Sequence, residues 1–148
     1  MSALSEAGRL ASLHRYPVKS MMGEELNSAR VTPKGLFGDR VYALCDAETH
    51  KVVSAKNPRK WPKLFNYRAT FVSPPETGVS LPAVRVTLPD GKLAFSGSAD
   101  FGGVLSGALG RPVTLLSAAP QNIEGDYALV NCFGCDGNNA ALVLKGLN

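Results

Sequence analysis

The amino-acid sequence predicts a mainly β fold of the α+β class, with one short helix near residues 99–109 and a C-terminal β-hairpin. Fifteen glycines and ten prolines in 148 residues favour a chain with many turns. Several segments alternate apolar and polar residues with the period of a strand, and the period becomes helical only after Ser98. The length suits one domain with a real core. We expect a β body over residues 1–118 and a hairpin over 119–148 that packs on it.

The first predicted strand lies within residues 10–18 and ends at a proline. Pro17 fixes its own φ and has no N–H, so the chain after it should leave the sheet at an edge or bulge. Residues 25–32 alternate again before the turn at Pro33. Three apolar residues of this segment are expected to face inward: Leu26, Ala29 and Val31.

The clearest strand covers residues 40–46, which are rich in strand-forming residues. A polar loop over 47–50 then returns the chain through residues 51–55, and we predict that these two strands are antiparallel neighbours. Within this unit, Cys45 should be a small buried residue and His50 should face solvent.

Residues 57–64 contain the only tryptophan and predict an irregular or single-turn segment, with Trp61 packed as a lid on one end of the β body. Residues 65–72 alternate like a strand, and the three prolines in 73–82 indicate a loop. The strongest hairpin signal is the pair of strands 84–88 and 93–95. The Asp-Gly step between them supplies the positive φ angles that a tight turn requires.

The helix prediction rests on apolar residues at helical spacing, with Ser98 as the N-cap and Gly110 as the stop signal. Residues 112–116 then predict the last strand of the body. Farther on, residues 127–131 and 140–144 predict two apolar strands around a loop over 132–139. The apolar residues that define the helix are Phe101, Val104, Leu105, Ala108 and Leu109.

The charge is distributed unevenly along the chain. The formal net charge is +4, but residues 1–68 contain 12 Lys and Arg against 6 Asp and Glu, whereas residues 69–148 contain 4 against 6. A small anionic ligand of the basic half is therefore expected. The cations form no run with interleaved aromatics, so we rank nucleic acid below a small anion and consider it unlikely.

No apolar run reaches the length of a signal core or a membrane span, so we expect a cytoplasmic protein without a membrane partner. Three cysteines, an odd number, also suit a reducing compartment. We interpret Cys132 and Cys135 as plain loop thiols, because a structural zinc needs four ligands and no second pair is present.

Lys19, Ser20 and Arg40 are the candidate binding residues. Two cations and a hydroxyl occur at strand ends beside residues that shape turns, and this set of donors can receive a phosphate or another oxyanion. The alternative interpretation is that Lys19 and Arg40 are solvated charges and that Pro17 and Gly38 only shape turns.

Several motifs together resemble the N-terminal β-barrel region of MOSC proteins, the family that includes molybdenum cofactor sulfurase C-terminal domains and the mitochondrial amidoxime reducing component. The resemblance covers residues 10–118 and implies an antiparallel β-barrel. It also implies that Lys19, Ser20 and Arg40 hold the pterin of the molybdenum cofactor and its phosphate. The matching segments are Tyr16-Pro17-Val18-Lys19-Ser20 with Gly23, Gly35-Leu36-x-Gly38-Asp39-Arg40, Ser54-Ala55-Lys56 with Pro58, and Leu109-Gly110-Arg111-Pro112-Val113.

The second half of MOSC proteins carries a cysteine that bears sulfur or ligates molybdenum, and this chain has no counterpart to it. We therefore expect a truncated domain that binds the cofactor or a similar anion, has lost catalysis and binds no metal by itself, although whether it is an enzyme stays open. Residues 126–144 instead resemble the last hairpin of β-ketoacyl synthases. The alternative is a noncatalytic interaction module that forms a homodimer through exposed strand edges or this hairpin.

Overall fold

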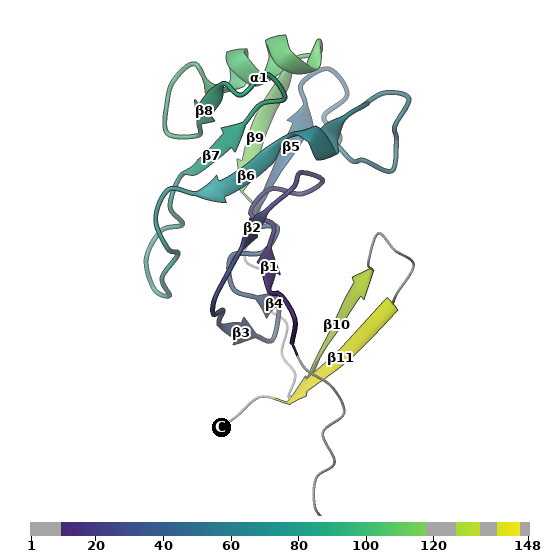
Figure 1. The fold of residues 1–148 in the computed structure, drawn as a ribbon. Coiled ribbons are helices and arrows are strands. Elements are labelled where there is room, and N and C mark those ends of the chain that lie inside the picture. The colour runs from purple at the N-terminus through teal and green to yellow at the C-terminus, as the bar shows by residue number, and fades with distance from the viewer. Residues whose placement is uncertain (1–9, 118–126, 134–138, 146–148) are drawn as a thin grey trace, which may run out of the picture.

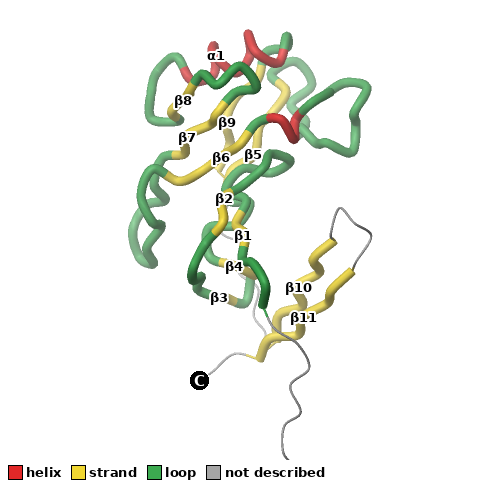
Figure 2. Tube along the Cα trace, in the orientation of Figure 1, coloured by secondary structure: helices red, strands yellow, loops and turns green. Residues whose placement is uncertain are grey.

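The computed structural model describes residues 10–117, 127–133 and 139–145. Figure 1 shows the arrangement of the elements, and Figure 2 shows how much of the chain between them is loop. The mainly β character is confirmed, with one α-helix in the described part. In chain order the elements are β1 (His14–Arg15), β2 (Glu24–Glu25), β3 (Val31–Thr32), β4 (Gly35–Leu36), β5 (Tyr42–Asp46), a 3-10 turn (Leu64–Asn66), β6 (Arg68–Phe71), β7 (Val84–Thr87), β8 (Leu93–Phe95), α1 (Phe101–Leu109), β9 (Val113–Ser117), β10 (Tyr127–Phe133) and β11 (Asn139–Lys145).

Two antiparallel sheets form the body. One pairs β5 with β9, and the other has the order β6-β7-β8. Alternation decides which residues face inward, since Val84 and Val86 on β7 are fully buried while Arg85 between them is exposed. The inward residues of both sheets join one apolar core, which includes Leu44, Ala69, Val84, Val86, Ala94 and Val113.

Residues 18–22 connect these two sheets. Val18 makes a parallel bridge to Tyr42 of β5, and Met22 makes a parallel bridge to Arg68 of β6. The amide of Lys19 donates to the Tyr42 carbonyl at 2.9 Å, and the amide of Met22 donates to the Tyr67 carbonyl at 2.8 Å. Backbone pairing therefore continues from β9 through β5 and residues 18–22 to β6, β7 and β8.

Helix α1 packs against both β8 and β9, at one end of the strands in Figure 1. It buries Phe101 and Leu105. The helix ends at Gly110 with a φ of +68°, as predicted. Its start differs from the prediction, because the N-cap is Asp100 and not Ser98. The amide of Phe101 donates to the Ser98 carbonyl at 3.2 Å, so Ser98 closes a turn just before the helix through its backbone.

The resemblance predicted an antiparallel β-barrel, and the described residues show no closed barrel, so this part of the prediction is not confirmed. Strand pairing gives five sheets among them, two of which are linked by the isolated bridges of Val18 and Met22, and no hydrogen-bonded strand joins β8 to β9. Helix α1 contacts both of these strands instead. The coarser prediction, a mainly β domain with one short helix, is confirmed.

One local prediction about β5 is confirmed, and one about β3 is wrong. The returning segment lies antiparallel beside β5, as predicted, through the bridge between Cys45 and Val52 and the bond from the Val53 amide to the Leu44 carbonyl at 2.8 Å. The partner of β5 along its whole length is β9. Val31 was predicted to face inward but is 48% exposed, because β3 pairs only with β4 in a separate two-stranded hairpin. By contrast, Cys45 and Trp61 are buried and His50 is exposed, as predicted.

The predicted C-terminal hairpin is present as the antiparallel pair β10 and β11, with Leu129 opposite Val143. Cys132 lies in β10 opposite Ala140, so the first strand continues into the segment predicted to be a loop. Cys135 lies outside the described residues. The division at residue 118 stays a prediction. Within the described ranges, no helix is long and apolar enough to cross a membrane.

Candidate anion-binding site

The segment of residues 16–20 lies directly beside residues 40–42, so the structure brings Lys19 and Arg40 onto paired stretches of backbone. The amide of Arg40 donates to the Tyr16 carbonyl at 2.6 Å. The amide of Tyr42 donates to the Pro17 carbonyl at 3.0 Å, and the amide of Lys19 donates to the Tyr42 carbonyl at 2.9 Å. The missing N–H of Pro17 costs nothing here, because its carbonyl makes the contact.

Asp39 orients the Arg40 side chain. One carboxylate oxygen of Asp39 accepts from the Tyr16 amide at 2.8 Å, and the other accepts from Nε of Arg40 at 2.7 Å. The Asp39 side chain is 14% exposed and that of Arg40 is 66% exposed. Within residues 10–117, Nε is the only guanidinium nitrogen of Arg40 in a hydrogen bond. Both Nη groups can therefore bind an oxyanion from solvent.

Ser20 is held by a hydrogen bond that leaves its proton free. Its Oγ accepts from the Ala55 amide at 3.1 Å. A hydroxyl that accepts in this way still has one O–H to donate. The exposed Lys56 follows Ala55 in the chain and so lies one residue from this contact. Sequence reasoning recognised this segment as a motif but gave Lys56 no role, since nothing in the local pattern shows that Ala55 contacts Ser20.

Ser20 and Arg40 share an unusual backbone conformation. Their φ angles are +66° and +50°, and in the described part only His50 and Lys63 are other non-glycine residues with positive φ. A left-handed non-glycine residue costs about 1–3 kcal/mol, and such strain concentrates at functional sites. Two of the three predicted site residues are therefore in a strained conformation that the surrounding backbone contacts must maintain.

Asp46, at the end of β5, makes contacts that stabilise the fold. Its side chain pairs with Lys60, and Oδ1 accepts from the amides of Glu48 and Thr49 at 3.0 and 3.2 Å. The hydrogen bond from Lys60 and those from the two amides hold the pKa of Asp46 well below its usual range. These contacts fix the loop over residues 47–50. They also pair the charge of Lys60 with a carboxylate of the protein.

Metal ligands do not gather in the described residues, where no group of three or more His, Cys, Asp or Glu side chains could hold a metal ion. The side chains of residues 19, 20 and 40 are instead all hydrogen-bond donors. An ammonium, a hydroxyl and a guanidinium all donate hydrogen bonds, and two of them carry positive charge.

These features define a small, mainly β domain that presents cations from two paired segments. Residues 7–96 match the family described as the MOSC N-terminal beta barrel domain, and the chain belongs to this family. The resemblance recognised in the sequence is confirmed over this range. The MOSC family is linked in general to the molybdenum cofactor. No curated protein and no solved structure matches the chain. The resemblance of residues 126–144 to β-ketoacyl synthases stays a prediction.

Proposed function

We propose that this MOSC N-terminal domain binds the phosphate and pterin of a molybdenum cofactor, or a similar small anion, through Lys19, Ser20 and Arg40. The cofactor would supply the metal and the pterin, and the domain would supply hydrogen-bond donors to the anionic end. We assign no catalytic residue to this chain.

The arrangement around Ser20 and Arg40 is the observation that supports the proposal most. Asp39 holds the Nε edge of Arg40 and leaves the Nη groups exposed, while Ala55 occupies an acceptor position of Ser20 and leaves its proton available. A planar guanidinium grips two phosphate oxygens at once, and a hydroxyl adds one directional donor. The donor set thus fits a phosphate better than a metal ion or an apolar ligand.

A titration of the full chain with inorganic pyrophosphate, followed by calorimetry at low salt, tests this proposal. A hydrogen bond to a charged group contributes about 1.5–3 kcal/mol, so Arg40→Ala should weaken binding by about tenfold or more. Molybdopterin released anaerobically from a molybdoenzyme serves as the second probe. If it binds more tightly than pyrophosphate, the site recognises the pterin as well as the phosphate.

The matched control is Arg85→Ala, which removes the same exposed charge from β7, on the other sheet. The proposal expects Arg85→Ala to bind pyrophosphate as the wild type does, apart from a small salt-dependent change. Equal affinities for wild type and Arg40→Ala would refute the proposal. Equal weakening by both substitutions would show general charge attraction and no defined site.

The alternative function, a noncatalytic interaction module that forms a homodimer, has one favourable observation. Strand β8 is an edge of the three-stranded sheet, and its Leu93 and Phe95 are 49% and 41% exposed. Exposed apolar edge strands favour pairing with another chain. Light scattering on the full chain tests this proposal. A dimer that dissociates in Phe95→Lys supports the β8 edge, and one that depends on residues 126–144 supports the hairpin. A monomer at all concentrations refutes both.

A further inference from the structure

A second candidate site has a lining that does not include Lys19, Ser20 or Arg40. A hollow of about 340 Å³ opens between the β3–β4 hairpin and the loop that joins β6 to β7. Five residues line it: Arg30, Phe37, Pro75, Glu76 and Thr77. This volume is at the lower end of the range for small-molecule sites, about 300–1,000 Å³.

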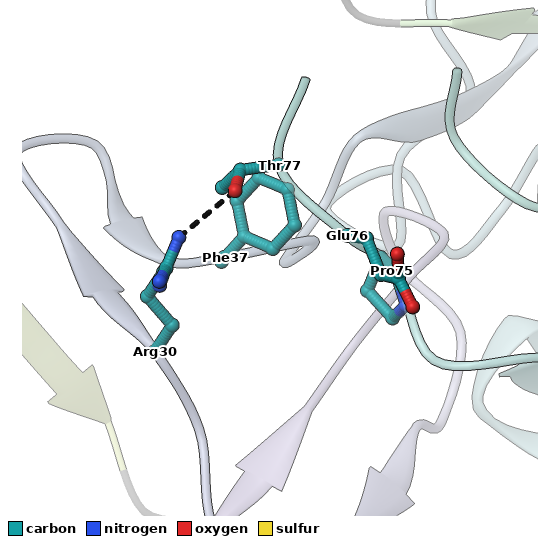
Figure 3. A pocket seen from close by; sticks show the side chains of 5 residues that line it. All are labelled: Arg30, Phe37, Pro75, Glu76 and Thr77. Atoms are coloured by element: carbon teal, nitrogen blue, oxygen red, sulfur yellow. Dashed lines mark hydrogen bonds between the residues drawn. The ribbon is translucent and has the colours of Figure 1, made fainter. Parts of the chain in front are cut away.

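Two contacts hold the loop against the hairpin. Nη1 of Arg30 donates to Oγ1 of Thr77 at 3.0 Å, the bond drawn in Figure 3. Pro75 packs over Gly38, where an added Cβ would lie 3.1 Å from Cγ of Pro75 and where φ is +84°. Because a side chain at position 38 would push Pro75 away, this glycine allows the loop to approach. The hollow is therefore bounded by elements in fixed contact.

The two charged side chains of the lining lie on opposite sides of its aromatic ring. In Figure 3, Arg30 lies on one side of the half-buried Phe37 ring and Glu76 lies on the other. Both charged side chains are exposed, and among the described residues they form no ion pair with each other. A cation and an anion that do not pair with each other, on opposite sides of an aromatic ring, complement a ligand with the reverse order of charge.

We infer that this hollow binds a small zwitterion, with an anionic group at Arg30, a cationic amine at Glu76 and an aromatic or apolar body against Phe37 and Pro75. Arg30 suits a carboxylate because its guanidinium offers parallel donors. A ring stacked near Phe37 adds about 0.5–1.5 kcal/mol beyond the area that it buries. The site shares no residue with the proposed oxyanion site, so either proposal can fail without the other.

The test uses three benzene derivatives that carry both charged groups or only one of them: 4-(aminomethyl)benzoate, benzoate and benzylamine. Ligand-observed NMR on the full chain measures the affinity of each. We expect 4-(aminomethyl)benzoate to bind in a saturable manner and about threefold or more tightly than either singly charged compound, since each exposed ion pair contributes up to about 1 kcal/mol.

Substitutions assign each charge to its residue. Arg30→Gln should remove the advantage of 4-(aminomethyl)benzoate over benzylamine, and Glu76→Gln should remove its advantage over benzoate. Lys34→Gln and Glu48→Gln are the matched controls, because both residues are exposed and lie outside the lining. Equal affinity for all three compounds, absence of saturation, or equal effects of the controls would overturn the inference. The exposed positions of Arg30 and Glu76 make folded variants the expected result.

Discussion

Among the glycines that the structure describes, Gly23 has the least space for a side chain. An added Cβ would lie 2.0 Å from the Arg15 carbonyl oxygen and 2.9 Å from Cδ1 of Tyr16. This close approach allows β1 and β2 to pair and lets Nε of Arg15 reach Glu24 at 2.8 Å. The glycine recognised as part of the family motif is thus explained by backbone contact, without reference to a ligand.

We expect Gly23→Ala to destabilise the domain by about 1–3 kcal/mol, because the obstructing atom is backbone and cannot move aside as a side chain can. Gly103→Ala is the matched control. Gly103 lies in α1 with nothing within 4 Å of an added Cβ, so alanine there should stabilise the protein by about 0.5–1 kcal/mol. Urea unfolding curves measure both, and equal shifts would contradict this account.

Asp46 should make stability depend on acid pH. Its folded-state pKa is lowered, chiefly by Lys60, so its contribution is complete above the unfolded pKa of about 4 and is lost as pH falls further. Asp46→Asn should lower the free energy of unfolding at neutral pH. Below pH 4 this free energy should fall less steeply in the variant than in the wild type. The two proteins should converge in stability in strong acid.

The control for this prediction is Asp90→Asn. Hydrogen bonds from Lys92 also lower the pKa of Asp90, but that side chain is 52% exposed, so solvent screens the interaction. Acid unfolding followed by circular dichroism should therefore change little in Asp90→Asn. A larger effect there than at Asp46 would contradict the structural role of the Asp46–Lys60 pair.

The sequence nominates the candidate site residues, but it does not predict their backbone conformation. Residue types and the family motif indicate Lys19, Ser20 and Arg40. Nothing in the neighbouring sequence predicts the positive φ of Ser20 and Arg40, because glycine is the residue type that normally indicates such angles. Tertiary contacts with Ala55 and Tyr16 accompany them, and these contacts join distant parts of the chain.

At the scale of elements, local signals predicted turns well and distant pairing poorly. The Asp-Gly turn correctly places β7 beside β8, and Gly110 correctly ends α1. The same local reasoning correctly placed residues 51–53 antiparallel beside β5, but it did not find the strand with which β5 pairs along its whole length, β9, about seventy residues away. Such a pairing depends on burial of both strands in a shared core, and alternation within one strand does not specify its partner.

The hydroxyl of Tyr67 should stabilise α1 specifically. Tyr67 is 3% exposed, and its hydroxyl donates to the Ala108 carbonyl in the last turn of the helix at 3.1 Å. Tyr67→Phe should therefore cost about 0.5–1.5 kcal/mol and speed hydrogen exchange at amides in α1.

Tyr42→Phe provides the comparison, because the Tyr42 hydroxyl also donates to one carbonyl, that of Pro82, at 3.1 Å. Its loss should affect the loop that joins β6 to β7 and leave exchange in α1 unchanged. Identical exchange patterns in the two variants would mean that neither hydroxyl acts on the element that it contacts.

At the scale of the whole molecule, residues 18–22 serve both the fold and the proposed site. They bridge β5 and β6, and they carry Lys19 and Ser20 at the connection between the two sheets. Lys19 therefore stands on a segment whose two ends bridge different strands, and the amide of Arg40 donates to the Tyr16 carbonyl just before that segment, which gives the rigid support that a preorganised anion site requires. The barrel that the family resemblance predicted is not needed for this support.

NMR of the labelled full chain during titration with pyrophosphate shows directly whether Lys19, Ser20 and Arg40 bind one anion together. We predict saturable shifts concentrated at the amides of Lys19, Ser20 and Arg40, with smaller shifts at Ala55 and Lys56. In Arg40→Ala the shifts at Lys19 and Ser20 should need about tenfold more ligand to reach saturation. Shifts that do not saturate, or that spread equally to Arg85 and Lys92, would contradict the claim that these paired segments form a defined anion site.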